Sequence, residues 1–186
     1  MIFRELELER AYVIDLEPRE DERGFNARSW CRREFEEHGI PVDIAQANVI
    51  YNRHLGTLRG MHRQAPPHAE SKLFRCTRGA VFDAIVDLRP GSRTYGRWTG
   101  VELRAEDYRM LFVPEQFGQG FITLADDTEL TYQVSEFYEP GHELGFRYDD
   151  RAFAIEWPIE VAVISEKDRS WPPFEADSAG AGGGTA

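Results

Sequence analysis

Residues 72–89, KLFRCTRGAVFDAIVDLR, indicate the fold class of this chain. Within them, residues 80–88 (AVFDAIVDL) alternate in the way that sends successive side chains of an extended strand to opposite faces. One face is apolar and holds Phe82, Ala84, Val86 and Leu88. The other is mixed and holds Val81, Asp83, Ile85 and Asp87. We therefore expect a β-strand with one packed face and one mixed face.

Turn signals divide the chain after this strand into further short segments. Clusters of small, polar or turn-forming residues recur at 90–92, 105–107, 125–127 and 139–141. Their close spacing favours an antiparallel β-sandwich or barrel. Two more strands are expected earlier in the chain, at residues 12–16 and 42–51. The sequence therefore predicts an all-β fold.

One short helix is expected between those two early strands. Ser29 can cap its start, and Gly39 can end it. Cys31, Phe35 and His38 recur at helical spacing between the two.

Length and composition predict one domain. The chain has 186 residues, of which 41% are hydrophobic, enough for a sizeable core. We expect one globular domain over residues 1–175. Residues 176–186 (ADSAGAGGGTA) are small and glycine-rich, so we expect them to form a flexible tail.

Charge and hydropathy exclude some partners. The formal net charge of -11 argues against nucleic acid or an anionic membrane, because both need extended positive surface. There is no run of 18 apolar residues, and the first ten, MIFRELELER, are charged where a signal peptide is apolar. We expect a cytoplasmic protein with a small ligand.

A basic segment interrupts this acidic chain. Between Arg53 and Arg78, six Lys or Arg residues stand against one acid, Glu70. The segment contains His62, and a histidine with a pKa of about 6.5 suits proton transfer near neutral pH. Its arginines suit phosphate oxygens. The same segment is also compatible with a solvated basic loop and a structural histidine.

A tyrosine on a later strand is open to two interpretations. Along residues 129–135 (ELTYQVS), Leu130, Tyr132 and Val134 share one face. A buried tyrosine needs a partner for its hydroxyl group. That partner is either a backbone carbonyl in a core or a ligand in whatever the face lines.

Five motifs spread along the chain carry a family resemblance. They are LRGMHRQ (58–64), KLFRCTRGAVFDAIVDLR (72–89), SRTYGRW (92–98), VPEQFGQGF (113–121) and ISEKD (164–168). Together they resemble the dTDP-4-dehydrorhamnose 3,5-epimerase family, from about residue 21 to about residue 173. The resemblance implies a jelly-roll cupin barrel with one or two short helices, normally a homodimer. It also implies an isomerase that inverts C3, C5 or both in a nucleoside-diphosphate 4-keto-6-deoxy sugar, without a cofactor.

The resemblance implies a set of four residues for proton transfer. His62 would be the base, and Asp168 would orient its imidazole within hydrogen-bond reach. Lys72 would stabilise the enolate that forms at C4 when a neighbouring carbon loses its proton. Tyr132 would return a proton to the opposite face.

The resemblance also implies a substrate-binding set. It consists of Arg23, Gln46, Asn48, Arg59, Gln119, Tyr138 and Glu143. Arg23 and Arg59 would hold the diphosphate, and Tyr138 would stack on the nucleobase. Gln46 and Asn48 would contact the nucleoside.

Three positions depart from the family pattern. Gln119 stands in place of a histidine that contacts substrate, Asn26 in place of an aromatic residue, and Arg28 in place of a nucleotide-binding glutamate. The four proton-transfer residues are unchanged. A mono-epimerase that acts at C3 or C5 alone, on a different nucleotide sugar, is therefore an alternative.

Two further classes of protein compete with the epimerase. Many cupins hold a metal, and His62, Gln64, His68 and Glu70 lie near the position of a metal-ligand group. Amides are weak ligands for such ions, so we expect no metal. A non-catalytic cupin that binds a nucleotide sugar would need only the arginines and the stacking aromatic residue.

Overall fold

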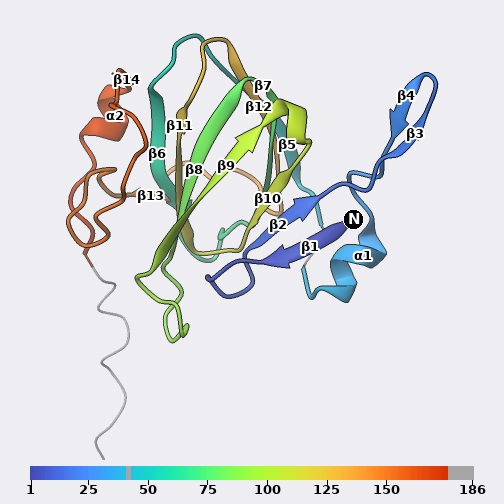
Figure 1. The fold of residues 1–186 in the computed structure, drawn as a ribbon. Helices are drawn as coiled ribbons and strands as arrows, with labels where there is room; N and C mark the ends of the chain where they lie inside the picture. Colours follow the sequence, from blue (N-terminus) through green and yellow to red (C-terminus); the bar gives the residue numbers. More distant parts are fainter. Residues whose placement is uncertain (41–42, 176–186) are drawn as a thin grey trace, which may run out of the picture.

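The computed structural model describes residues 1–40 and 43–175, and most of them belong to two facing β-sheets (Figure 1). In spatial order, the first sheet contains β1 (Ile2–Glu5), β2 (Tyr12–Asp15), β10 (Met110–Val113), β7 (Lys72–Arg78), β12 (Thr128–Val134) and β5 (Gln46–Asn52). The second contains β13 (Glu143–Gly145), β6 (Thr57–Gln64), β11 (Phe117–Thr123), β8 (Ala80–Asp87) and β9 (Trp98–Arg104), with β14 (Val163–Ile164) beside β6. The prediction of an all-β fold is confirmed.

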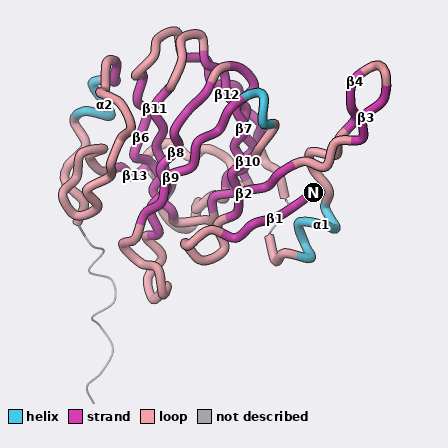
Figure 2. The backbone as a smooth tube through the Cα atoms, in the orientation of Figure 1, coloured by secondary structure: helices cyan, strands magenta, loops and turns pink. Residues whose placement is uncertain are grey.

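The remaining elements are short. They are the hairpin of β3 (Arg19–Asp21) and β4 (Gly24–Asn26), α1 (Arg32–Glu37), the 3-10 turn η1 (Ala105–Asp107), and α2 (Glu166–Arg169). The β3–β4 hairpin projects away from the two sheets (Figures 1 and 2). No helix in the described part of the chain is long and apolar enough to cross a membrane. The expected tail, 176–186, lies outside the described residues.

Strand β8 is packed on both faces. Its apolar face, with Ala84 and Val86, packs against Phe146 and Phe153 of the segment after β13. Its mixed face looks inward, where Ile85 joins the core shared by both sheets. The two carboxylates on this face, at 83 and 87, are fully buried. The expectation of one packed face was therefore incomplete, because the sequence did not show that a distant segment covers the outside.

The helix begins later than expected. Its N-cap is Cys31, with no capping hydrogen bond from a side chain, so the assignment of Ser29 as the cap was wrong. Ser29 lies in a non-helical stretch before the first helical residue, too early to reach the free N–H groups of the first turn. The end is as expected, with Gly39 at a φ of +66°.

The strand expected at 42–51 starts at Gln46. Its partner β12 ends at Val134, which pairs with Gln46, so the sheet offers no further strand partner before that residue. Residues 41–42 lie outside the described part of the chain. The strand expected at 12–16 is β2.

Candidate active site

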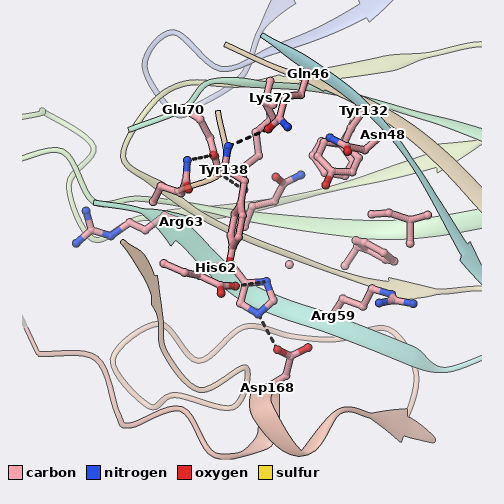
Figure 3. Close-up of a pocket in the computed structure, with 18 of the residues that line it drawn as sticks. Gln46, Asn48, Arg59, His62, Arg63, Glu70, Lys72, Tyr132, Tyr138 and Asp168 are labelled. Carbon is pink, nitrogen blue, oxygen red and sulfur yellow. Dashed lines mark hydrogen bonds and ion pairs between the residues drawn. The ribbon is translucent and has the colours of Figure 1, made fainter. Parts of the chain in front are cut away.

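A cavity of about 660 Å³ lies between the two sheets and is open to solvent. The resemblance implies eleven proton-transfer and substrate-binding residues, and ten of them line the cavity: Gln46, Asn48, Arg59, His62, Lys72, Gln119, Tyr132, Tyr138, Glu143 and Asp168. They come from β5, β6, β7, β11, β12, β13 and α2 and from the loop after β12. Figure 3 shows how these side chains gather around one space. Residues that are far apart in the sequence thus form one site.

His62 and Asp168 form a hydrogen-bonded pair at one side of the cavity (Figure 3). The imidazole Nε2 lies 2.7 Å from Oδ1 of the carboxylate, within the reach expected of an orienting partner. The other ring nitrogen, Nδ1, lies 4.0 Å from a carboxylate oxygen of Glu143. With Nε2 engaged, Nδ1 is the nitrogen available for a substrate proton.

The environment of Asp168 favours its ionised form. Burial by itself would raise the pKa of this carboxyl group, but the hydrogen bond and charge of His62 act the other way. The backbone N–H of Gly60 and the hydroxyl group of Ser165 add to that effect. The net result is a lowered pKa. Ser165 also caps α2, because its Oγ accepts a hydrogen bond from the N–H of Asp168.

A glycine lets the strand of His62 approach its neighbour. Gly60 has a φ of +130°, and a Cβ atom placed there would lie 2.4 Å from Cα of Gly120 on β11. Only glycine tolerates both the backbone conformation and the contact. This approach sets Gln119 directly across the strand pair from His62, next to an irregularity in the pairing.

Tyr132 reaches the same cavity from the facing sheet. Its ring stacks on Phe74 at 4.8 Å between centroids. Burial, and then the negative charge of Glu70, raise its pKa, so the phenol keeps its proton at neutral pH. None of the residues that the structure describes hydrogen-bonds to its hydroxyl group. A core tyrosine bonded to a backbone carbonyl is therefore the wrong interpretation.

Lys72 lies deep in the cavity wall beside an acid. Its ammonium nitrogen is 3.2 Å from Glu70, and both side chains are mostly buried. Glu70 also accepts a hydrogen bond of 2.5 Å from Gln64. From the sequence, Glu70 was considered only as the single acid of a basic segment and as a possible metal ligand, not as a partner of Lys72. The ion pair holds a positive charge at the cavity surface.

Hydrogen bonds help to position further polar residues that line the cavity; we call Arg59, Gln46, Asn48 and Tyr138 the rim residues. Arg59 donates from Nε to the side chain of Asn52 at 2.8 Å, which orients its guanidinium group. The Gln46 side-chain oxygen accepts from the backbone N–H of Tyr138 at 2.8 Å. Tyr138 itself is exposed, so its ring face is free to stack on a planar group.

Arg23 is the one candidate residue that the structure places away from the cavity. It lies on the β3–β4 hairpin, its side chain is 84% exposed, and it pairs with Asp21 at 2.6 Å. Asn26 ends the same hairpin, and Arg28 pairs with Glu34 at 2.9 Å. Within one chain, the residues that depart from the family pattern near the N-terminus do not line this cavity.

Sequence reasoning missed two charged residues of the site. Lys167 lines the cavity and forms an ion pair with Glu143. Its signal was its place in the ISEKD motif, beside Asp168. Asp83 lies fully buried behind Gln119, whose Nε2 is 3.0 Å from each of its carboxylate oxygens. Burial raises the pKa of Asp83 to about 7, although the amide of Gln119 and the charge of Lys72 oppose the shift.

The residues weighed as a metal-ligand group have other contacts. The amide of Gln64 donates to Glu70 and to the backbone oxygen of His68, and it accepts from the N–H of Glu139 at 2.8 Å. In the described ranges, no three His, Cys, Asp or Glu side chains are grouped to hold a metal ion. The absence of a metal stays a prediction, to be checked by metal analysis of protein purified without chelator.

Known proteins resemble the chain over nearly its whole length. A family model described as dTDP-4-dehydrorhamnose 3,5-epimerase matches residues 5–176. A protein of that name from Methanothermobacter thermautotrophicus is 40% identical over 177 residues, which cover 92% of this chain and 94% of the relative. A dTDP-4-dehydrorhamnose 3-epimerase from Streptomyces niveus is 37% identical over 170 residues, which cover 91% of this chain and 82% of the relative.

Solved structures show the same likeness. The crystal structure of a dTDP-4-dehydrorhamnose 3,5-epimerase from Bacillus anthracis, with TDP and PPi bound, superposes with a TM-score of 0.87 at 36% identity. The match covers 93% of this chain and all of that chain (100%). With these neighbours, the predicted jelly-roll cupin fold is confirmed.

Proposed function

Because the chain belongs to the dTDP-4-dehydrorhamnose 3,5-epimerase family, we propose that it is an isomerase of nucleotide sugars. It inverts C3 and C5 of a nucleoside-diphosphate 4-keto-6-deoxy sugar. The observation that carries the proposal is that His62 and Tyr132 reach one cavity from two facing sheets. A base and a proton donor on opposite sides of a sugar ring are what inversion requires.

The chemistry begins with removal of a proton next to the ketone. Nδ1 of His62 takes the proton from C3 or C5, and the electron pair moves to the oxygen at C4. The ammonium group of Lys72 stabilises the enolate oxygen that results. Tyr132 then gives its phenolic proton to the same carbon from the opposite face. The cycle closes when His62 releases its proton to solvent and Tyr132 regains one.

Asp168 acts through His62 in this scheme. Its carboxylate holds the imidazole by Nε2 and leaves Nδ1 facing the cavity. Since its pKa is lowered, it stays ionised at neutral pH and stabilises the imidazolium that forms when His62 takes up a proton. Asp168 is therefore a positioning residue.

The rim residues supply the binding site for the nucleotide. Arg59 presents a guanidinium group to the diphosphate, and Tyr138 presents an exposed ring to the nucleobase. Gln46 and Asn48 lie beside them on β5 for the nucleoside. The relative from Bacillus anthracis, crystallised with TDP and PPi, supports a ligand of this kind.

The proposal includes a homodimer and a cytoplasmic location. The projecting hairpin carries Arg23 away from the cavity of its own chain, and a second copy gives it a phosphate to bind. Exposed apolar residues lie on this hairpin and on β5, including Phe25, Val49 and Tyr51. Residues 1–175 would make up the catalytic domain.

A mono-epimerase is the second candidate, favoured by the 3-epimerase from Streptomyces niveus among the relatives. Gln119 adds to it, because a changed contact near His62 alters how the sugar is presented. Overall identity does not separate the two activities, since relatives of both kinds lie between 37% and 42%.

Solvent exchange distinguishes the candidates. The protein is incubated in deuterated water with dTDP-4-keto-6-deoxyglucose, and label at each carbon is read by NMR. Deuterium at both C3 and C5 is expected, with none at either carbon for His62→Ala. Label at one carbon only would establish the mono-epimerase. No exchange with any nucleotide form of the sugar would favour a non-catalytic binding protein.

A further inference from the structure

A buried amide at the end of β6 has a hydrogen-bond partner at each of its polar atoms. Gln64 is only 2% exposed. Its Nε2 lies 2.5 Å from a carboxylate oxygen of Glu70, 3.0 Å from the backbone oxygen of His68 and 3.1 Å from that of Phe137. Its Oε1 accepts from the backbone N–H of Glu139 at 2.8 Å. The side chain therefore links β6 to the segment that follows β12.

These partners fix the orientation of the amide. Three oxygen atoms surround Nε2, and oxygens of carbonyl and carboxylate groups accept hydrogen bonds. A reversed amide would set its own oxygen against those three and its NH2 group against the N–H of Glu139. Glu70 is held in turn by Lys72, whose ammonium nitrogen is 3.2 Å away. Gln64 therefore presents one fixed pattern of donor and acceptor.

Two of the hydrogen bonds reach the backbone on either side of Tyr138. Nε2 of Gln64 donates to the carbonyl oxygen of the residue before it, and Oε1 accepts from the N–H of the residue after it. The N–H of Tyr138 itself donates to Gln46 at 2.8 Å. The backbone of this short segment is thus fixed by side chains.

The segment depends on these bonds because its own side chains are poorly packed. Phe137 and Tyr138 are 62% and 56% exposed, so burial does little to hold them in place. A group that is ordered before its ligand arrives loses less conformational freedom on binding. Hydrogen bonds that order the backbone at Tyr138 therefore favour binding of whatever stacks on its ring.

We propose that Gln64 is a positioning residue for nucleotide binding, which holds the backbone on both sides of Tyr138 so that the ring is in place to stack on the nucleobase. The inference rests on the proposed function and deepens it, because it assigns a residue that acts on nucleotide recognition through Tyr138. The same amide bonds to Glu70, the partner of Lys72, and so joins the nucleotide end of the cavity to the end where the enolate is stabilised.

A double-mutant cycle on dTDP binding tests this role. Gln64→Met keeps the length of the side chain and removes its hydrogen bonds. Calorimetry with dTDP, which has the base and the diphosphate but no sugar, should show about tenfold weaker binding. In Tyr138→Ala the ring is absent, so the same substitution should weaken binding by less than about twofold further. A general loosening of the site would instead weaken binding equally in both backgrounds.

Steady-state kinetics give a second readout. In Gln64→Met, Lys72 keeps Glu70 as its partner, so the chemical step should change little. We expect KM for dTDP-4-keto-6-deoxyglucose to rise about tenfold while kcat stays within about threefold of wild type.

Hydrogen exchange in the wild-type protein tests the contact without any variant, and so it decides the matter even if Gln64→Met does not fold. The N–H of Glu139 bonds to the Gln64 side chain, so it should exchange at least about tenfold more slowly than in an unstructured peptide of the same sequence. Mass spectrometry with fragmentation to single residues measures this rate.

The outcomes separate this inference from the proposed function. The role of Gln64 is refuted, while the epimerase proposal stands, if Gln64→Met or Tyr138→Ala binds dTDP as tightly as wild type. An equal loss in both backgrounds, or an unprotected N–H at Glu139, refutes it as well. If the wild-type protein binds no nucleotide and no deuterium enters the keto sugar, both proposals fall.

Discussion

Asp168 and Asp83 are two buried carboxylates near one cavity whose surroundings shift their pKa values in opposite directions. Burial tends to raise the pKa of Asp168, but the imidazole of His62, a backbone N–H and a hydroxyl group stabilise the ionised form, so its pKa is lowered. Asp83 has one amide, and burial raises its pKa to about 7. Hydrogen bonds and charge decide the first case and desolvation decides the second. The site thus has one carboxylate that is ionised at neutral pH, beside His62, and one that titrates near neutral pH, behind Gln119.

Replacing Asp168 by Asn tests the orienting role at the residue scale. The amide can still fill the space, but it cannot stabilise an imidazolium, so we expect kcat to fall about 10²- to 10⁴-fold with little change in KM. The measurement is deuterium exchange into the keto sugar under saturating and limiting substrate. His62→Ala should lose at least as much, and the double variant no more than His62→Ala alone. An exchange rate within about threefold of wild type would mean that His62 needs no carboxylate partner.

The raised pKa of Asp83 predicts that part of the folding stability is lost as the pH rises toward neutral. Its folded pKa of about 7 lies above the ordinary value of 3.8, so the folded protein binds a proton that the unfolded chain releases. This contribution to stability is complete at low pH and is lost as the pH rises from about 4 to about 7. The groups that face the carboxylate, Gln119 by its hydrogen bond and Lys72 by its charge, reduce the loss without reversing it.

Urea unfolding of the wild-type protein and of Asp83→Asn at about pH 5 and pH 8 measures this effect. The wild type is expected to lose up to about 2–3 kcal/mol more than the variant over this interval. An equal loss in both proteins would show that Asp83 stays ionised throughout.

At the scale of elements, the alternation in residues 80–88 was enough to predict β8 but not its surroundings. A strand with two acids on one face looks half solvated, yet Asp83 and Asp87 are both fully buried. Asp83 accepts a hydrogen bond from Gln119 on β11, and Asp87 accepts hydrogen bonds from the loop that follows β8. The alternation did not reveal either partner, because it shows which side chains share a face of the strand and not which groups pack against that face.

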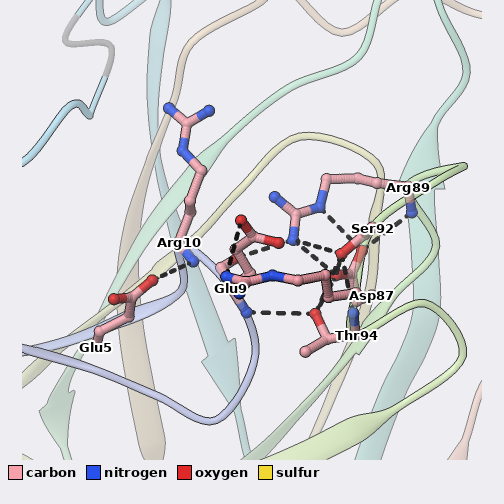
Figure 4. A network of polar contacts seen from close by, with 8 residues as sticks. Glu5, Glu9, Arg10, Asp87, Arg89, Ser92 and Thr94 are labelled. Carbon is pink, nitrogen blue, oxygen red and sulfur yellow. Dashed lines mark hydrogen bonds and ion pairs between the residues drawn. The ribbon is translucent and has the colours of Figure 1, made fainter.

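The second acid organises the loop between β8 and β9 (Figure 4). Asp87 accepts hydrogen bonds from Arg89 at 2.6 Å, Ser92 at 2.6 Å and Thr94 at 2.5 Å. Arg89 also donates to the backbone oxygen of Glu9 at 2.8 Å, which ties this loop to the one between β1 and β2. The SRTYGRW motif at 92–98, one of the signs of the family resemblance, thus has a structural role outside the lining of the cavity.

Asp87→Asn should therefore destabilise the fold without changing the chemistry. Burial opposes ionisation of Asp87, but the hydrogen bonds from its three partners lower its pKa. Its contribution is present at neutral pH and is lost as the pH falls. We expect the free energy of unfolding to drop by about 1–3 kcal/mol at pH 7, with kcat of the folded protein unchanged. Glu102→Gln, which removes an exposed partner of Arg104, is the control and should change stability little.

At the scale of the whole molecule, the sequence correctly predicted that residues far apart along a single chain meet at one cavity. His62 and Asp168 are 106 positions apart and came together in expectation only because their motifs resemble one family. Spacing alone gave no such link. Arg23 had the same kind of motif support, but it lies on a hairpin that projects away from the two sheets, and a motif does not show where its residues lie in space.

Subunit mixing tests whether Arg23 completes the site of a second copy. Under the proposed function, Arg23→Ala would lack the phosphate contact and His62→Ala would lack the base, so each homodimer should be nearly inactive. In a mixed dimer, the cavity of the Arg23→Ala chain has its own His62 and receives the intact hairpin of the other chain. Random mixing makes half of the dimers mixed, each with one complete site of two, so the mixture should recover about a quarter of wild-type activity. If the hairpin served its own cavity instead, no dimer would hold a complete site, and the mixture would stay inactive. Since Arg23 is 84% exposed and contacts only its neighbour Asp21 in the described part of the chain, recovery is the expected result.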